Sequence, residues 1–217
     1  MGNNHFGNFD TAKSMIRIAM ESGADLVKFQ AFKASTISGS MPASFYDQCE
    51  FTFSQCTDLL IEGLKVGVPV FFSIFHDEYS ALATGQKYWK VAGAQAKKGV
   101  LPDCENTFVS LPDGFLFHAA KFKKSTPLYV CEYLPEDPQL DALLYLAKLC
   151  EDRPYGYSDH YAGTLAAIHA VKTFGCTVIE KHFTLEKNVP FQGRVFRDTV
   201  HGATPNELEA IAKAMSG

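Results

Sequence analysis

The sequence lacks several features that would place it outside the globular, non-membrane proteins. Its 217 residues contain no run approaching 18 apolar residues, and the first ten show neither the basic nor the apolar region of a signal peptide. No low-complexity tract is present, and 20% charged with 47% hydrophobic residues is typical of a chain that builds a core. We therefore expect one large domain, residues 1–217, located in the cytoplasm with no membrane partner.

Basic clusters and cysteine pairs are missing as well. The formal net charge is -4 and the basic residues are scattered, so we expect no nucleic-acid partner. The six cysteines form no CxxC pair and lie mostly in apolar runs, which is typical of reduced core thiols. A glycine-rich dinucleotide loop is also absent, because residues 2–7 do not have the GxGxxG spacing.

Strand and helix patterns alternate along the chain. Residues 10–22 have the apolar spacing of an amphipathic helix, with Asp10 as its cap and Gly23 at its end. Further helices are predicted at 57–66, 162–174 and 205–215, and strands at 25–30, 68–75, 88–93, 114–118, 127–133, 155–160 and 177–185. Such alternation indicates an α/β protein with parallel strands.

Seven predicted strands, with an eighth ending at residues 1–2, match the (β/α)8 TIM-type barrel. Polar residues follow the carboxyl ends of these strands, where such barrels carry their active sites, which favours the barrel over an open doubly wound sheet. Only residues 121–126 separate two of the strands, too few for a crossover helix. We therefore expect a barrel with one outer helix missing and a truncated first strand.

Two histidines follow neighbouring predicted strands. Side chains alternate along a strand, so Ser158 and His160 share a face, as do Glu180 and His182. If the strands are parallel neighbours, both imidazoles point into the same space, where they suit a divalent ion such as Mn, Zn or Fe. The alternative is that each histidine is satisfied by hydrogen bonds inside a barrel.

Four sequence motifs resemble those of the sialic acid synthase family. They are Gly-Asn-Asn-His-Phe-Gly-Asn at 2–8, Gly-Ala-Asp-Leu-Val-Lys-Phe-Gln at 23–30, Gly-Tyr-Ser-Asp-His at 156–160 and Val-Ile-Glu-Lys-His-Phe-Thr-Leu at 178–185. The resemblance implies a barrel enzyme that condenses phosphoenolpyruvate with an N-acyl aldose, such as an N-acyl hexosamine. The products would be a sialic-acid-like nine-carbon 2-keto sugar acid and phosphate, for surface glycan biosynthesis.

The resemblance also implies roles for individual residues. His160 and His182 would hold Mn²⁺, or Mg²⁺ or another divalent ion, while Lys28, Gln30, Lys90 and Ser158 would bind phosphoenolpyruvate. We count both histidines and both lysines as catalytic. A trianionic substrate needs such charges and donors, although either lysine could instead extend from a strand end to solvent.

Four more residues are predicted to contact substrate. Asn4 and His5 line the sugar pocket or else cap a turn with their side chains. Glu180 orients a histidine ligand or else pairs with a neighbouring lysine. Tyr133 lies at the end of a predicted strand.

Departures from the family keep other functions open. The family's catalytic glutamate falls before Met1, its Ser-Thr-Pro reads Ser-Ile-Phe at 73–75, and its Ser-Thr-Gly becomes His-Ala-Ala at 118–120. The nearest candidate for the family's later aspartate is Asp198. No C-terminal antifreeze-like domain is expected; because the resemblance implies dimers formed through that domain, the choice between a homodimer and another oligomeric state stays open. The alternatives are a sugar- or phospho-ligand-binding pseudoenzyme of the same fold and a metal-dependent barrel aldolase.

Overall fold

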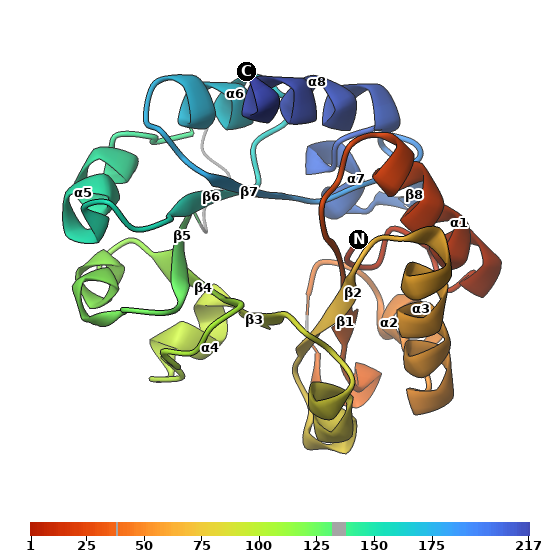
Figure 1. The fold of residues 1–217 in the computed structure, drawn as a ribbon. Helices are drawn as coiled ribbons and strands as arrows, with labels where there is room; N and C mark the ends of the chain where they lie inside the picture. Colours follow the sequence, from red (N-terminus) through yellow and green to blue (C-terminus); the bar gives the residue numbers. More distant parts are fainter. Residues whose placement is uncertain (38, 132–137) are drawn as a thin grey trace. The chain divides into compact units, whose positions relative to one another are not determined.

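A computed structural model describes residues 1–37, 39–131 and 138–217 (Figure 1). Its internal contacts divide the chain into two compact units. The first unit contains residues 1–87 and 182–209, and the second contains residues 88–181 and 210–217. Tyr133, predicted to contact substrate, lies outside the described residues.

The elements of the first unit are α1 (Phe9–Glu21), β1 (Val27–Ala31), η1 (Ala34–Thr36), α2 (Ala43–Cys49), α3 (Phe53–Val66), β2 (Val70–Ile74), η2 (Asp77–Thr84), β8 (Pro190–Phe191), β9 (Arg194–Val195) and α7 (Arg197–His201). Those of the second are β3 (Trp89–Val91), α4 (Gly93–Lys97), β4 (Thr107–Pro112), η3 (Leu116–Lys121), β5 (Thr126–Val130), α5 (Ala142–Cys150), β6 (Gly156–Asp159), α6 (Leu165–Lys172) and β7 (Val178–Lys181). The last helix, α8, is Pro205–Ser216.

The first unit is built on the parallel pair β1 and β2. Their register runs from Val27 opposite Val70 to Ala31 opposite Ile74. Because side chains alternate, Phe29 and Phe72 lie in the hydrophobic core formed with α1 and α3, which cover one face of the pair (Figure 1). The other face carries Lys28, Gln30 and Ser73 together with the buried Phe71.

Helix α1 begins earlier than the sequence pattern predicts. Its cap is Asn8, whose side-chain oxygen accepts a hydrogen bond from the Thr11 N–H at 2.8 Å, so the prediction of Asp10 as the cap is wrong. An asparagine oxygen one residue before the first turn satisfies a helical N–H that Asp10, inside the helix, does not. Gly23 follows the helix with a φ of 92°, as predicted.

A glutamine side chain takes the place of a further strand beside β2. The side-chain oxygen of Gln86 accepts from the Phe72 N–H at 2.9 Å, and its amide donates to the Phe72 carbonyl at 3.2 Å. Gln86 is buried, so both backbone groups of Phe72 are satisfied without a strand partner. No sequence pattern indicated this contact.

The second unit contains a five-stranded, all-parallel sheet in the order β3-β4-β5-β6-β7. Helices α5 and α6 lie on one side of this curved sheet (Figure 1). The core between the layers contains Val109, Tyr129 and Tyr157 from successive strands. The predicted α/β class with parallel strands is confirmed, as is the parallel pairing of the two strands before His160 and His182.

One predicted strand is wrong. Residues 114–118 are not extended; β4 occupies Thr107–Pro112, and residues 116–121 form the 3-10 helix η3. Gly114, with a φ of 78°, makes the turn after β4, and Leu116 and Ala119 then bury the same face of a three-residue helical turn. The connection from β4 to β5 therefore contains a short helix. A helix was expected to be missing there only because the strand was predicted too late in the chain.

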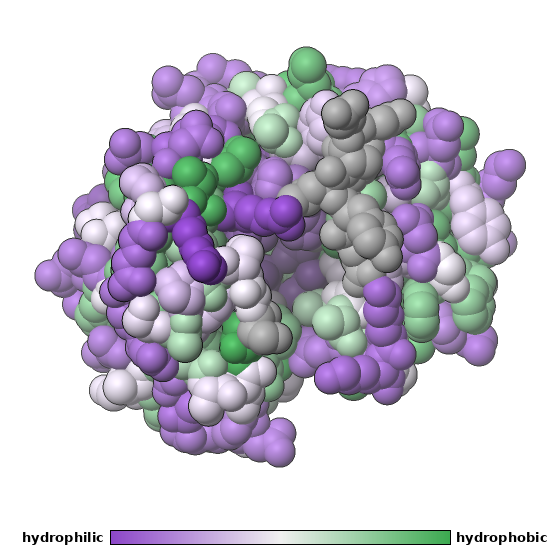
Figure 2. Space-filling model, turned by 180° about the vertical axis from the view of Figure 1, so that it is seen from behind, coloured by the Kyte–Doolittle hydropathy of each residue, from purple (hydrophilic) through white to green (hydrophobic). Residues whose placement is uncertain are grey.

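Polar residues dominate the face of the molecule shown in Figure 2, where hydrophobic residues appear as small separate patches. Among the described helices, none is both long enough and apolar enough to cross a membrane.

Candidate functional site

Four polar side chains meet on one face of the sheet in the second unit; we call them the Lys90 cluster. The Lys90 ammonium donates to the Ser110 hydroxyl at 2.8 Å and lies 2.9 Å from Glu180 Oε2. The Ser158 hydroxyl donates to the same Oε2 at 2.6 Å. Lys90 on β3 and Ser158 on β6 thus share one carboxylate on β7, and Lys90 also holds Ser110 on β4.

Strand register explains why these residues meet. Ser158 lies directly opposite Glu180 in the β6–β7 pair, as the predicted alternation requires. Lys90 lies opposite Phe108, and Ser110 is two residues further along the same face of β4. Neighbours of opposite parity, such as Val91 and Val109, point into the hydrophobic core. The polar set therefore occupies the face that does not pack against the helices.

The chemistry of the Lys90 cluster suits an anionic ligand. One ammonium and two hydroxyls can each donate to a phosphate or carboxylate oxygen. Of the two roles predicted for Glu180, the structure shows the pairing with a lysine, since its carboxylate contacts Lys90. The Lys90 side chain is 5% exposed, so it does not extend into solvent.

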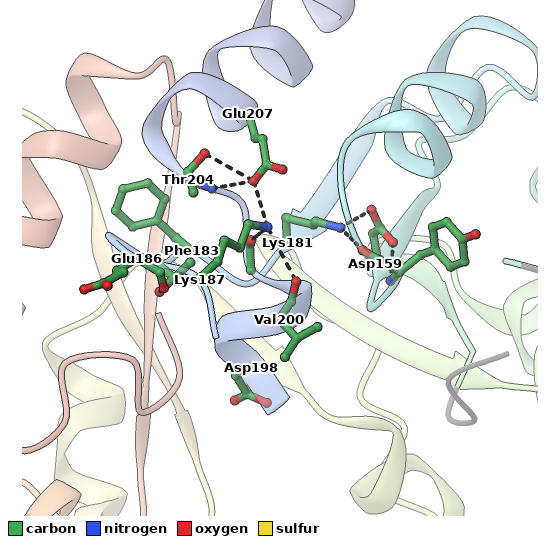
Figure 3. A network of polar contacts seen from close by, with 12 residues as sticks. Asp159, Lys181, Phe183, Glu186, Lys187, Asp198, Val200, Thr204 and Glu207 are labelled. Carbon is green, nitrogen blue, oxygen red and sulfur yellow. Dashed lines mark hydrogen bonds and ion pairs between the residues drawn. The ribbon is translucent and has the colours of Figure 1, made fainter. Parts of the chain in front are cut away.

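A second polar contact fixes the chain on either side of His160. The Lys181 ammonium lies 2.6 Å from Asp159 Oδ2, and their side chains are 3% and 0% exposed (Figure 3). Asp159 Oδ1 accepts from the Tyr161 N–H at 2.8 Å, and Lys181 also donates to the Tyr161 carbonyl. Since Asp159 and Tyr161 are both held, the backbone that carries the partly exposed His160 has little freedom.

In the first unit, His182 lies beside Asp198. Their Nδ1 and Oδ2 atoms are 3.5 Å apart, and the side chains are 18% and 27% exposed. Gly2 has a φ of 56°, and a Cβ atom there would lie 3.1 Å from both polar atoms, so glycine allows the backbone to approach them closely.

Asn4 anchors the same region. Its amide donates to the Phe183 carbonyl at 2.8 Å and to the Asp198 carbonyl at 3.2 Å, and the residue is 5% exposed. These bonds tie the loop before α1 to the residue after His182 and to α7. Figure 3 shows a further contact of this unit, in which Lys187 reaches Glu207 at a distance of 2.8 Å.

His5 is a buried, stacked histidine. Its Nδ1 accepts from the Gly7 N–H at 3.1 Å, and its ring stacks on Phe51 with centroids 4.4 Å apart. The side chain therefore caps a turn, which is one of the two predicted roles. Burial lowers the pKa of His5 from 6.5 to about 3.

This burial predicts a pH dependence of stability. Between pH 6.5 and pH 3 the unfolded chain binds a proton on His5 and the folded chain does not. The contribution of neutral His5 to the free energy of unfolding is therefore fully present above pH 6.5, and it is lost progressively as the pH is lowered towards 3. We expect His5 to contribute a loss of about 1.4 kcal/mol in the free energy of unfolding per pH unit in this range. His5→Asn keeps an acceptor for Gly7, so denaturant titrations from pH 7 to 5 should show a shallower slope.

His76 provides a matched control for this experiment. Its Nδ1 accepts from the Glu78 N–H at 3.2 Å, the same turn contact two residues on, so His76→Asn reports the effect of changing the hydrogen bond itself. Equal slopes for the wild type and His5→Asn would contradict the predicted coupling.

Lys28 and Gln30 lie on the face of β1 that points away from α1 and α3. Both are partly exposed, and in the parallel register Gln30 lies opposite Ser73. Ser73 is 1% exposed, and within the described part of the chain its hydroxyl has no hydrogen-bond partner. The α-amino group of Met1 donates to the Lys28 carbonyl at 2.6 Å, which places residue 1 beside β1.

The side chains of His182 and Asp198 suit a divalent ion and would supply two of its ligands. An imidazole nitrogen beside a carboxylate oxygen is a donor set that suits Mn, Zn or Fe. Across residues 1–37, 39–131 and 138–217, no group of three or more His, Cys, Asp or Glu side chains is arranged as a metal site. Metal binding by His160 and His182 therefore stays a prediction.

Three residues that make these contacts were not predicted from the sequence: Ser110, Asp159 and Lys181. Ser110 was missed because β4 was predicted too late in the chain. With β4 at 107–112, the residues at its end are Ser-Leu-Pro at 110–112 instead of the predicted His-Ala-Ala at 118–120, so a serine lies at the end of this strand. The alternation along β6 and β7 could have revealed the Asp159–Lys181 pair, since both residues end their strands on the same face.

Comparison with known proteins identifies the relatives of this chain. Residues 125–216 match the sequence model of the NeuB family. The chain is 27% identical over 225 residues to the N,N'-diacetyllegionaminic acid synthase of Campylobacter jejuni, covering 87% of this chain and 67% of that protein. It is also 27% identical over 256 residues to the human N-acetylneuraminate-9-phosphate synthase, covering 99% and 67%. The resemblance to the sialic acid synthases is confirmed.

Solved structures of two similar proteins share the fold of this chain. The N-acetylneuraminic acid synthetase of Leptospira borgpetersenii, in complex with citrate, has a TM-score of 0.79 at 21% identity, over 99% of this chain and 80% of that one. The spore coat polysaccharide biosynthesis protein SpsE of Bacillus subtilis has a TM-score of 0.75 at 24% identity, over 100% and 65%. The predicted TIM-type fold class is thereby confirmed. The chain spans about two thirds of the length of the curated relatives it matches.

Proposed function

We propose that this chain takes part in condensing phosphoenolpyruvate with an N-acyl aldose, giving a sialic-acid-like 2-keto sugar acid and phosphate. The observation that carries the proposal is the Lys90 cluster, in which an ammonium and two hydroxyls meet on the polar face of the sheet. Relatives named as sialic acid and legionaminic acid synthases support this reaction class.

Each group in the Lys90 cluster has a task in such a reaction. Lys90 neutralises charge on the phosphate group as the ester is bound, and Ser110 and Ser158 donate hydrogen bonds to its oxygens. The low exposure of Lys90 strengthens these contacts, because little water competes for them. We assign Lys28 and Gln30 to the same substrate on the resemblance alone.

A divalent ion, proposed to be Mn²⁺, would polarise the sugar aldehyde when bound. We assign His160 and His182 as its ligands on the resemblance alone, and Asp198, 3.5 Å from His182, is a further candidate. The Asp159–Lys181 pair holds the backbone beside His160, which orients that imidazole.

Phosphate release tests the proposal. Purified protein is incubated with phosphoenolpyruvate, Mn²⁺ and a panel of N-acyl hexosamines, and free phosphate is measured against time. We expect release that requires both the metal and one of the sugars, and that His182→Ala abolishes. His76→Ala, a histidine in the same unit that caps a turn, is the matched control and should retain activity.

Three results would contradict the proposal. Release that is independent of sugar would indicate a phosphatase activity, and activity with pyruvate in place of phosphoenolpyruvate would indicate an aldolase. A folded protein that binds phosphoenolpyruvate but releases no phosphate with any sugar would favour a binding function without turnover.

A further inference from the structure

The Lys90 cluster already contains an anion of its own. A single oxygen, Glu180 Oε2, accepts the hydrogen bond of Ser158 at 2.6 Å and lies 2.9 Å from the Lys90 ammonium. Lys90 and Ser158 are the donors that the proposed function assigns to the phosphate group. Glu180 Oε2 therefore lies where an oxygen of a bound ligand would meet the same two donors.

Because Lys90 is buried, it can pair either with the Glu180 carboxylate or with a bound phosphate group, but not favourably with both. The Lys90 side chain is 5% exposed, and an ammonium so deeply buried requires a counter-charge, which Glu180 supplies. A phosphate group that joined Lys90 while Glu180 stayed would place two negative charges next to each other, which is unfavourable. The Glu180 side chain is 22% exposed, so its carboxylate has a route to solvent.

We propose that Glu180 is an internal competitor for the anionic ligand. It holds Lys90 and Ser158 while no ligand is bound, gives them up to a phosphate group, and takes them back when phosphate leaves. The identity of the ligand rests on the proposed function, whereas the competition rests on the geometry of the Lys90 cluster. Glu180 thus lowers the affinity of the site for phosphate and favours release of the product.

Titration with inorganic phosphate, followed by calorimetry at fixed ionic strength, tests this role. Glu180→Gln keeps an oxygen that can accept from Lys90 and Ser158 but removes the negative charge. We expect its Kd for phosphate to fall by about tenfold or more, the effect of removing one neighbouring like charge. Glu105→Gln makes the same charge change at an exposed position of the second unit and should leave the Kd unchanged.

Lys90→Met separates failure of this inference from failure of the proposed site. If Lys90→Met weakens phosphate binding but Glu180→Gln binds no more tightly than the wild type, the competitor role is wrong and the site stands. If phosphate binding does not depend on Lys90 in any background, both are wrong. Glu180→Ala, which also removes the carboxylate, should change the Kd in the same direction and replaces Glu180→Gln should that variant fail to fold.

Discussion

Replacing Lys181 by methionine is expected to lower the free energy of unfolding by about 3–5 kcal/mol. Its ammonium lies 2.6 Å from Asp159, and the two side chains are 3% and 0% exposed. Methionine fills a similar volume but leaves the Asp159 carboxylate buried without its counter-charge. The loss reflects this uncompensated charge, because a buried ion pair as a whole adds little net stability. Equilibrium unfolding in urea measures it.

Two further variants define the origin of this loss. Lys65→Met removes a lysine whose partner Glu62 is 3.5 Å away and whose own side chain is 69% exposed, so we expect a change of about 0.5 kcal/mol or less. Combining Lys181→Met with Asp159→Asn removes the buried charge and should recover part of the lost stability. A loss below about 1 kcal/mol in Lys181→Met would show that the pair is more hydrated than its burial indicates.

Replacing Lys90 by methionine is expected to raise the KM for phosphoenolpyruvate by about 10- to 150-fold. A hydrogen bond to a charged group contributes about 1.5–3 kcal/mol, which corresponds to this range. The reason is that Lys90 is the one positive charge of the Lys90 cluster, and Ser110 and Ser158 alone do not neutralise a phosphate group. Steady-state kinetics with saturating metal and sugar give the value.

Lys98→Met is the matched control, since Lys98 is exposed and belongs to the same unit. It should leave the KM unchanged. Circular dichroism of Lys90→Met excludes loss of the fold as the cause. An unchanged KM in a folded Lys90→Met protein would remove Lys90 from the substrate site and would favour the alternative that it only neutralises Glu180.

Short-range sequence patterns predicted most elements of this fold correctly. Six of the seven predicted strands coincide with strands among the described residues, and the helices predicted at 57–66, 162–174 and 205–215 correspond to α3, α6 and α8. These predictions succeeded because side-chain alternation and helical spacing are local properties. The strand at 114–118 failed because a 3-10 helix buries Leu116 and leaves Phe117 49% exposed, so the apolar run does not mark an extended, buried segment.

The sequence motifs that carry the candidate site residues were also recognisable, but the contacts between their side chains were not. Alternation placed Ser158 and Glu180 on matching faces, and the β6–β7 register confirms that they are opposite each other. Nothing local indicated that Lys90 on β3 would reach the carboxylate of Glu180 on β7, four positions away in the sheet order. A long lysine side chain spans that distance only once the sheet has formed and curved.

The sequence by itself therefore determined the α/β class and the positions of six of the predicted parallel strands, and it supplied candidate residues for binding an anion or a metal ion. Tertiary structure alone decided which of these residues meet, since their partners are separated by 20 or more positions: Ser110 with Lys90, Lys90 with Glu180, and Asp159 with Lys181. Strand register and burial select these pairs, because a charged group that leaves water must find its partner on whichever strand packs beside it.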